Sequence, residues 1–328
     1  MNGRGGNPLD KWGSINNLMK KRRIAILSLQ ETHPSDEMQK TIEKSFRNTL
    51  RILHSADPDN PGRKGGVSIV IHKSLLDAKN ATHQVVIPGR VNIVEIPWNE
   101  SDKLQIMNVY APVKNEEKAD FWKGLKEAID NDENLHPDVV LGDLNLVENP
   151  EIDRLNNRGG SDPEAARIEL SELTTELDLT DGWRRRNPRK RGYTFTGNGQ
   201  SRLDRIYVKE ELYQWCTDWK IEHPGFRTDH NMVSVQITSE NMPYIGKGRW
   251  ALPAYLLKNS HIKKRIQERA KHLQTVVERT SLIGDRANNP QTALKTFKME
   301  IIDIAREYQR THQPRLENTI RSLQKELE

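Results

Sequence analysis

The feature that most constrains the fold of this chain is a series of short apolar runs separated by polar stretches. The runs have the length of strands, and some, such as IAILSLQ and VSIVIH, are apolar almost throughout. A short and nearly unbroken apolar run is typical of a buried strand. We therefore predict strands at residues 24–30, 67–72, 91–97, 104–112, 138–145, 193–197, 203–208, 217–223 and 231–238.

Amphipathic helices are predicted between the earlier strands, at residues 14–23, 35–47, 115–131 and 161–179. Ser14 and Asn115 are the expected N-caps of two of them. Ser161 and Glu164 form a capping-box pattern in a third. The helices do not alternate strictly with the strands, and the later part of the chain is mostly strands. This order favours an α+β sandwich of two packed, mostly antiparallel sheets with outer helices over a doubly wound parallel sheet.

The character of the sequence changes near residue 240. Residues 241–328 contain few β-branched runs and many Lys, Arg, Glu and Gln residues, with helical periodicity at 256–280 and 291–312. Helices of this polarity bury little surface by themselves. We expect one domain at residues 1–240, followed by a helical, basic appendage or linker at 241–328.

Charge and cysteine content restrict the partners and the compartment. The formal net charge of +5 is compatible with a polyanionic partner. The only cysteine, Cys216, excludes an intramolecular disulfide and favours a reducing compartment. No apolar run reaches the roughly 20 residues of a membrane span, and the polar, glycine-rich start lacks a signal-peptide core. We expect a nuclear or cytoplasmic protein without membrane contact, and no feature indicates an obligate protein partner.

Acidic, amide, tyrosine and histidine residues follow the apolar runs, where strands meet loops. They are Glu31, Tyr110, Asp143, Asn145, Asp204, Asp229 and His230. Each has an ordinary explanation when taken singly, because Asp-x-Asn often bonds its own backbone and Asp204 has Arg205 beside it. The recurrence of the same few types at several strand ends favours a common site.

Hydrolysis of a phosphodiester needs these residue types. Mg²⁺ takes oxygen ligands from one or two carboxylates together with the substrate phosphate, and Glu31 suits that role. Asp143 suits a base that accepts a proton from the attacking water, with Asn145 orienting the water or a phosphate oxygen. His230 can donate to the phosphate if Asp204 holds it in its charged form. A hydroxyl such as that of Tyr110 is either a donor or, when ionised, a nucleophile or base, and we favour the donor.

Five segments, in this order, resemble the endonuclease/exonuclease/phosphatase superfamily. They are QETH (30–33), NVYAP (108–112), GDLN (142–145), SRLDRIYV (201–208) and TDHNMVSV (228–235). The resemblance covers roughly residues 1–240 and is greatest to the endonuclease domains of non-LTR retrotransposons, where a reverse transcriptase follows. It implies a four-layered, DNase I-like α/β sandwich. It also implies a Mg²⁺-dependent enzyme, with Mn²⁺ as a substitute, that nicks DNA and leaves a 3′-hydroxyl.

The resemblance assigns roles to individual positions. Glu31 matches the metal-binding glutamate, and the expected catalytic positions are Tyr110, Asp143, Asn145, Asp204, Asp229 and His230. The family opens with a strand that ends in an asparagine turn, and Met1-Asn2-Gly3 matches only the second half of that turn. Asn2 is therefore a second expected metal-site residue. We expect the first strand to be missing, and this copy to be weakly active or inactive.

Basic residues near the expected site are candidates for DNA contact. The run RRRNPRKRG (184–192) is either a phosphate-binding loop, a nuclear-import signal or an ordinary solvated loop. Phe226 is a candidate for a wedge into a DNA groove, whereas Trp183 is expected in the core. The residues expected to contact DNA are Arg185, Arg186, Thr194, Ser201 and Arg202.

Two other functions are compatible with the sequence. One is a catalytically dead remnant that binds DNA through its basic surface. The other is a phosphodiesterase or phosphatase of the same fold that acts on a substrate other than DNA, such as an inositol phosphate or a lipid.

Overall fold

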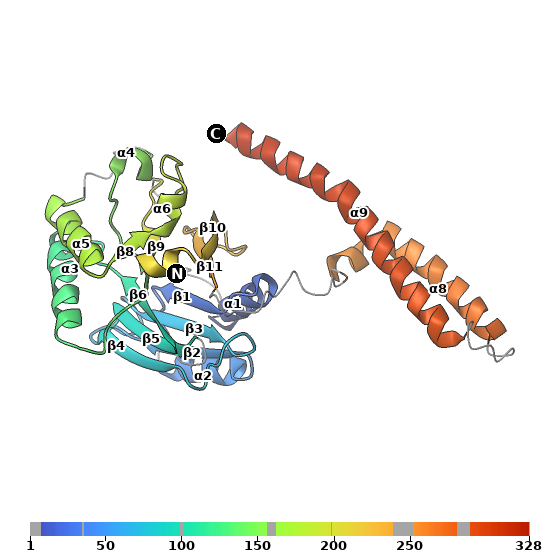
Figure 1. Cartoon of the computed structure of the whole chain (residues 1–328), viewed down its shortest axis with the longest axis horizontal. Coiled ribbons are helices and arrows are strands. Elements are labelled where there is room, and N and C mark those ends of the chain that lie inside the picture. The colour runs from blue at the N-terminus through green and yellow to red at the C-terminus, as the bar shows by residue number, and fades with distance from the viewer. Residues whose placement is uncertain are drawn as a thin grey trace. The chain divides into compact units, whose positions relative to one another are not determined.

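Two β-sheets packed face to face, with helices on their outer sides, build the first part of the chain (Figure 1). The computed structural model describes residues 8–34, 36–98, 102–155, 162–197, 199–238, 252, 254–280 and 289–327. The chain divides into two compact units, residues 1–242 and 243–328, and each is described by itself.

The larger sheet has six strands in the order β4-β5-β6-β7-β9-β8. Its members are β4 (Thr82–Ile87), β5 (Val91–Pro97), β6 (Lys103–Tyr110), β7 (Val139–Asp143), β8 (Leu179–Asp181) and β9 (Asp204–Lys209). All neighbouring strands are antiparallel except β6 and β7, which are parallel. Since parallel strands end at the same edge of a sheet, the polar residues that follow β6 and β7 lie together.

The opposite sheet consists of two pieces. Its strands are β1 (Ile26–Gln30), β2 (Leu50–Ser55) and β3 (Val67–His72), in the order β1-β3-β2, and the hairpin of β10 (Cys216–Glu222) and β11 (Met232–Ile237). Apolar side chains of both pieces share one core with the larger sheet, among them Ile69, Val94, Ile106, Val208 and Val233. Within the described residues, β1 pairs only with β3 and β11 only with β10.

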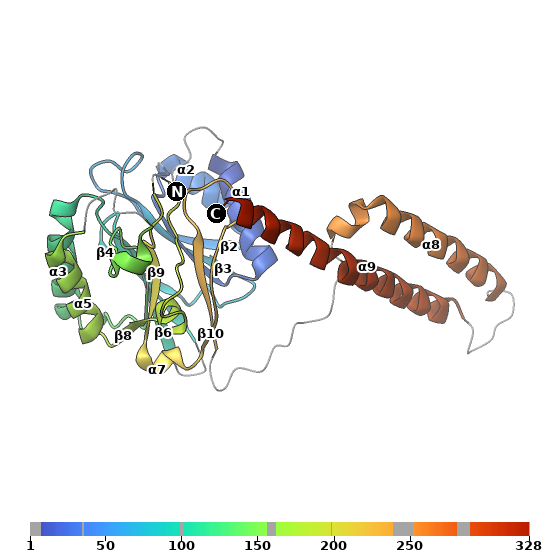
Figure 2. The same cartoon turned by 90° about the horizontal axis from the view of Figure 1, so that it is seen from above.

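Helices cover the outer face of each sheet (Figures 1 and 2). The apolar faces of α1 (Pro8–Arg22) and α2 (Asp36–Phe46) pack on the sheet of β1, β2 and β3 through Ile15, Met19 and Ile42. The helices α3 (Asn115–Asp130) and α5 (Glu164–Glu176) pack on the larger sheet through Trp122 and Leu170. Each large apolar side chain buried in this way contributes about 1.5–3 kcal/mol. The predicted DNase I-like sandwich of four layers is confirmed.

The start of the first helix was predicted too late in the sequence. Its first residue is Pro8, which suits the first turn of a helix, so Ser14 lies inside the helix and donates from Oγ to the carbonyl of Asp10. The expected cap at Asn115 is also wrong, because Lys114 is the N-cap of α3 and makes no side-chain cap bond. Helix α5 begins after Pro163, and the expected cap Ser161 lies outside the described residues.

Residues 193–197, predicted as a strand, form only isolated bridges, in which Phe195 faces Ser201 and His230. Several elements lacked a clear sequence signal. They are β2, β4, β8 and the short helices α4 (Pro150–Asp153), α6 (Gly182–Arg186) and α7 (Glu210–Tyr213). Most of these elements are short or exposed, so their hydrophobic periodicity is weak, whereas in the buried β2 polar residues interrupt the apolar run.

The second unit is a pair of long helices. It contains the 3₁₀ turn η2 (Ala254–Lys258), α8 (Ser260–Thr280) and α9 (Pro290–Leu327). A small core of Leu256, Ile262, Ile304 and Ala305 joins them, and an ion pair links Arg265 to Glu307 at 3.0 Å. Among the described residues of both units, no helix combines the length and apolar character needed to cross a membrane.

Candidate active site

Three of the expected catalytic residues lie in a row across the larger sheet. Tyr110 is paired with Asp143 in the register of β6 and β7, and Asp143 is paired with Asp204 in the register of β7 and β9. Strand pairing therefore fixes the relative positions of residues that are far apart in the sequence.

Close approach of two backbones explains the glycine of GDLN. Gly142 has φ +145°, and a Cβ atom at this position would lie 1.9 Å from the carbonyl oxygen of Val109 on β6. No other residue type fits this position without moving the strands apart. Gly142 thus allows β7 to place Asp143 beside Tyr110.

Two of the expected site residues have a left-handed backbone, namely Glu31 with φ 53° and Asn145 with φ 46°. Residues other than glycine adopt this conformation at a cost of about 1–3 kcal/mol, and such residues cluster at functional sites. Glu31 directly follows β1, and Asn145 follows the first loop residue after β7. The turn at each residue directs its side chain to the edge of the sheet.

Glu31 and Tyr110 form the first polar pair of the site. The Tyr110 hydroxyl donates to Oε1 of Glu31 at 2.6 Å. Burial opposes ionisation of Glu31, but this hydrogen bond keeps the pKa of the carboxyl below its usual value. Burial and the hydrogen bond to Glu31 raise the pKa of Tyr110, so the phenol stays protonated. Tyr110 is therefore a hydrogen-bond donor in this structure.

A buried amide attaches the strand before Glu31 to the larger sheet. Asn108 is fully buried, and its Nδ2 lies 3.4 Å from the carbonyl of Leu29 and 3.3 Å from that of Ser68. The side chain of Gln30 donates to Asn108 Oδ1 at 2.7 Å. Because a buried polar group is costly unless it is paired, these bonds hold the end of β1 over β6.

Asp143 and Asn145 are held by the loop that joins them. Asp143 Oδ1 accepts the backbone N–H of Asn145 at 3.0 Å, and Asn145 Nδ2 donates to the carbonyl of Ala111 at 2.9 Å. The bond to Ala111 holds the amide of Asn145, whose oxygen, Oδ1, is a hydrogen-bond acceptor.

Asp204 and His230 form the second pair. His230 Nδ1 lies 2.9 Å from Asp204 Oδ2. Burial favours the neutral ring, but the hydrogen bond to Asp204, together with the charges of Asp204, Asp143 and Asp229, raises the pKa of His230 to about 9. Burial, followed by repulsion from Asp204, raises the pKa of Asp143. The site thus combines a charged imidazolium with a carboxyl that takes up a proton readily.

Arg205 is the neighbour of Asp204 in the sequence, but it is not the ion-pair partner of Asp204. Successive side chains of a strand point to opposite faces, and Arg205 is fully buried with Asp181 at 3.8 Å and Glu148 at 3.9 Å. The partner of Asp204 is His230.

Within the described residues, Asp143, Asp204 and His230 form one group whose ligand atoms lie within 4.8 Å of one another and could hold a metal ion. The imidazole of His230 is engaged with Asp204 and favours its charged form, which is not a metal ligand. Glu31 offers an ionised carboxylate, the oxygen donor that a hard cation prefers. The expected second ligand, Asn2, lies outside the described residues.

Comparison with known proteins identifies the relatives of this site. The profile of the endonuclease/exonuclease/phosphatase family matches residues 6–230. The chain belongs to this family.

Similar proteins of known sequence or structure agree with membership of this family. The transposon TX1 uncharacterized 149 kDa protein of Xenopus laevis is 28% identical over 229 residues, which are 67% of this chain and 16% of that protein. The endonuclease domain of TRAS1, a telomere-specific non-LTR retrotransposon, has a TM-score of 0.50 and 15% identity, covering 70% of this chain and 92% of that domain. The 3′ phosphatase NExo from Neisseria, bound to product DNA hairpin, has a TM-score of 0.57 and 17% identity, covering 70% of this chain and 95% of that one.

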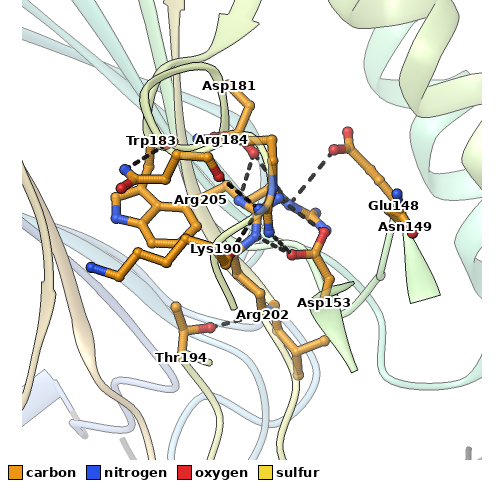
Figure 3. A network of polar contacts seen from close by, with 12 residues as sticks. Glu148, Asn149, Asp153, Asp181, Trp183, Arg184, Lys190, Thr194, Arg202 and Arg205 are labelled. Carbon is orange, nitrogen blue, oxygen red and sulfur yellow. Dashed lines mark hydrogen bonds and ion pairs between the residues drawn. The ribbon is translucent and has the colours of Figure 1, made fainter. Parts of the chain in front are cut away.

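A buried network of ion pairs lies beside the site of this family member (Figure 3). Arg202 binds both carboxylate oxygens of Asp153, at 2.6 and 3.0 Å, and also bonds Asp181. Arg184 binds the same carboxylate of Asp153. Arg202 and Asp153, at the centre of the network, each have a side chain that is 1% exposed. Figure 3 shows these groups converging from separate segments.

Two of the residues expected to contact DNA, Arg202 and Thr194, are buried and bound within the protein. Arg202 is buried and fully engaged with carboxylates, so it does not offer its charge to DNA. Thr194 is fully buried, and its hydroxyl accepts two backbone hydrogen bonds. Phe226, expected as a wedge, packs against the core formed by α1 and the sheet of β1, β2 and β3. Trp183 lies in the core, as expected, with 4% exposed.

The remaining expected residues lie at or near the surface. Arg186 is exposed, whereas Arg185 is paired with Glu210 and lies over the ring of Tyr213. Ser201 is half-buried. Asp229 is exposed and contributes charge to His230, although the hydrogen bond of His230 goes to Asp204.

Two basic residues at the site had no motif to mark them. Arg90 follows the turn between β4 and β5, and its guanidinium lies 4.8 Å from the centre of the Tyr110 ring. Lys11 on α1 is half-buried. Burial lowers the pKa of its ammonium group, although the negative charges of Glu31 and Asp229 act in the opposite direction. Only the fold brings these cations to the site, although the turn sequence Pro-Gly-Arg marks the first as a residue at a hairpin tip.

Proposed function

We propose that this chain is a Mg²⁺-dependent phosphodiester hydrolase that nicks DNA, of the type that serves retrotransposons. The observation that carries the proposal is the Asp204–His230 pair, with its imidazolium held beside the buried carboxyl of Asp143. A cationic donor next to a carboxyl that accepts protons is the arrangement needed to hydrolyse a phosphodiester.

Asp143 and Asn145 act on the attacking water. Asp143, whose pKa is raised, accepts a proton from the water as its oxygen adds to phosphorus. Asn145 accepts a second water hydrogen at Oδ1, and the bond from its Nδ2 to the Ala111 carbonyl holds the amide in place. The bond between phosphorus and the 3′ oxygen breaks, the oxygen takes a proton from solvent water, and Asp143 returns its proton to solvent. The products are a 3′-hydroxyl and a 5′-phosphate.

His230 and Tyr110 act on the phosphate. The imidazolium of His230 donates to a phosphate oxygen as negative charge grows there, and Asp204 holds the ring in that orientation. The Tyr110 hydroxyl holds the carboxylate of Glu31 in place. Asp229 adds negative charge that supports the charged form of His230.

Glu31 is the residue that would hold the metal ion, because it is ionised and part-buried at the same edge of the sheet. A bound Mg²⁺, or Mn²⁺ in its place, would neutralise charge on the phosphate and the leaving oxygen. The assignment of Asn2 as a further ligand rests on the family resemblance.

DNA is the proposed substrate because of charge and relatives. Exposed basic residues follow α6, in the loop of Arg189, Lys190 and Arg191. Of the similar proteins, one is named as a transposon protein, another as a retrotransposon endonuclease domain, and a third is bound to product DNA. Arg186 and Ser201 are the proposed DNA contacts from the predicted set.

A nicking assay on supercoiled plasmid tests the proposal. The chain is expected to convert plasmid to the open circle, at a low rate, with Mg²⁺ and not with EDTA. The ends are expected to be ligatable without phosphatase or kinase treatment. The variants Asp143→Ala and His230→Ala are expected to lose at least about 10²-fold in rate. Asp120→Ala on the exposed side of α3 is the matched control and is expected to nick like the parent chain.

Nicking equal to that of the two alanine variants would overturn the proposal. Salt-dependent DNA binding without nicking would instead favour a catalytically dead DNA-binding protein. Release of phosphate from inositol phosphates, with no action on plasmid, would favour a different substrate for the same fold.

A further inference from the structure

Thr194 is a buried residue in a segment without regular strand pairing. The side chain is 0% exposed and lies between β9 and the loop that leads to β11. A polar side chain in such a position is costly unless its hydrogen bonds are satisfied. The partners of Thr194 therefore show what it does.

The hydroxyl of Thr194 holds the backbone at Asp204. Thr194 Oγ1 accepts the N–H of Leu203 and the N–H of Asp204, each at 2.9 Å. A hydroxyl oxygen has two lone pairs, so it can accept both bonds at once. The N–H of Leu203 lies directly before β9 and that of Asp204 belongs to its first residue, so the hydroxyl satisfies two backbone donors at the start of the strand.

The backbone around Thr194 holds the segment that carries His230. The carbonyl of Thr194 accepts the N–H of Asn231 at 2.6 Å, and the N–H of Thr196 donates to the carbonyl of Asp229 at 2.8 Å. The ring of Phe195 lies 5.2 Å from the ring of His230. Residues on both sides of His230 are thus bound to the same short segment.

The residues before Asp204 are held from the other side by the ion-pair network. The N–H of Arg202 donates to the carbonyl of Asp153 at 2.8 Å, and its side chain binds the Asp153 carboxylate. Figure 3 shows Thr194 next to this network. Asp204 is also paired with Asp143 in the sheet, so the Thr194 hydroxyl is the contact that holds the Asp204 backbone on the side of the His230 segment.

We propose that Thr194 is a positioning residue for the Asp204–His230 pair, and that its hydroxyl acts by holding the Asp204 backbone within reach of His230. This role replaces the DNA contact expected from the sequence. Its effect on nicking rests on the function proposed above, whereas the geometry of the pair does not depend on it.

Replacement of the hydroxyl by a methyl group tests the proposal in the full chain. In Thr194→Val the shape is kept and the two N–H groups lose their acceptor, while Thr194→Ser keeps the hydroxyl. Thr238→Val is the matched control, because the Thr238 hydroxyl donates to the Trp215 carbonyl at the far end of β11. Should Thr194→Val fail to fold, Thr194→Ala takes its place in the comparison with Thr194→Ser.

Two readouts are used with each folded variant. The first is the downfield proton resonance of His230 Nδ1 in DNA-free protein, assigned by its loss in Asp204→Asn. The second is kcat and KM for plasmid nicking. In Thr194→Val the resonance is expected to disappear and kcat to fall about 10- to 100-fold, with KM within about twofold. Thr194→Ser and Thr238→Val are expected to keep both.

Retention of the resonance and of kcat in Thr194→Val would overturn the proposal, and so would an equal loss in Thr194→Ser. A rise in KM with an unchanged resonance would also overturn it and restore a DNA contact. If the parent chain does not nick DNA, the function proposed above fails, and the resonance alone decides the role of Thr194.

Discussion

At the scale of single residues, burial and pairing decide which groups at the site carry charge. Asp204 and Asp143 both lie near His230, but only Asp204 shares a hydrogen bond with it. The bond keeps the imidazole charged, while burial raises the pKa of the Asp143 carboxyl. Two carboxyls of the same type thereby gain different properties from their surroundings.

The pH dependence of nicking follows from these two shifts. Asp143 acts in its deprotonated form, so activity is expected to rise with pH as the group loses its proton, above the usual range for an aspartate. His230 acts in its protonated form, so activity is expected to persist through neutral pH and to fall as pH rises through about 9. The profile of kcat/KM against pH measures both limbs. A basic limb near the ordinary histidine pKa of about 6.5 would contradict the assigned role of His230.

Metal affinity distinguishes Glu31 from the Asp143–Asp204–His230 group as the cation site. Glu31→Gln removes the ionised oxygen donor and is expected to weaken Mn²⁺ binding at least about 10-fold. His230→Ala is expected to leave the affinity within about twofold, because the ring is engaged with Asp204. Isothermal titration with Mn²⁺ measures the affinity without reference to activity. The reverse order of effects would place the ion at His230.

At the scale of secondary-structure elements, the site depends on how closely β6 and β7 approach. Parallel pairing brings Tyr110 and Asp143 into register, and the absence of a side chain at Gly142 allows the contact with Val109. The loop residues that follow each strand then reach the same edge. Sheet geometry, rather than loop sequence, sets the separation of the catalytic groups.

Gly142→Ala is expected to be strongly destabilising. The added Cβ would meet the backbone of Val109 at 1.9 Å, and the positive φ disfavours alanine, so a loss of about 3 kcal/mol or more is expected. Gly124→Ala in α3 is the matched control, because open space surrounds that position. Alanine there is expected to stabilise the chain by about 0.5–1 kcal/mol. Urea unfolding followed by circular dichroism measures both, and equal midpoints would contradict the packing argument.

At the scale of the whole molecule, the two units differ in the use of their charge. The first unit combines a buried ion-pair network with exposed basic residues at the end of α6 and in the loop that follows it. In the described residues of the second unit, ion pairs bridge the two helices, Arg265 with Glu307 and Arg269 with Glu300, and further basic residues of α8 are exposed. The exposed basic residues of the first unit belong to the unit that carries the site.

The salt dependence of DNA binding is expected to depend on the exposed basic loop. Each phosphate contact contributes a slope of about −0.9 to log K against log salt, so removal of four contacts lowers the slope by at most about 3–4. Fluorescence anisotropy with a labelled duplex measures the slope. The residues to replace together by alanine are Arg186, at the end of α6, and Arg189, Lys190 and Arg191 of the loop.

A matched set on α8 controls for net charge. The residues to replace together by alanine are Lys263, Lys264, Lys271 and Arg279, all of them exposed. The slope is expected to stay unchanged in this variant. An equal loss in both sets would show that net charge, and not the loop, carries the binding.

The sequence alone determined the layered fold and the residues at the strand ends. Strands β3 and β5 begin and end where the apolar runs do, because burial on both faces leaves a local hydrophobic signal. The types of Glu31, Asp143 and His230 likewise limit the chemistry, whatever their surroundings.

Only the tertiary structure decided what the polar residues between the strands do. Arg202 carries a charge that looks available to DNA, but its partners Asp153 and Asp181 lie 49 and 21 residues away in the sequence and bury it. Thr194 changed from an expected DNA contact to a buried acceptor for the same reason. Charge and hydrogen-bonding capacity are local properties, whereas the groups that satisfy them are chosen by the fold.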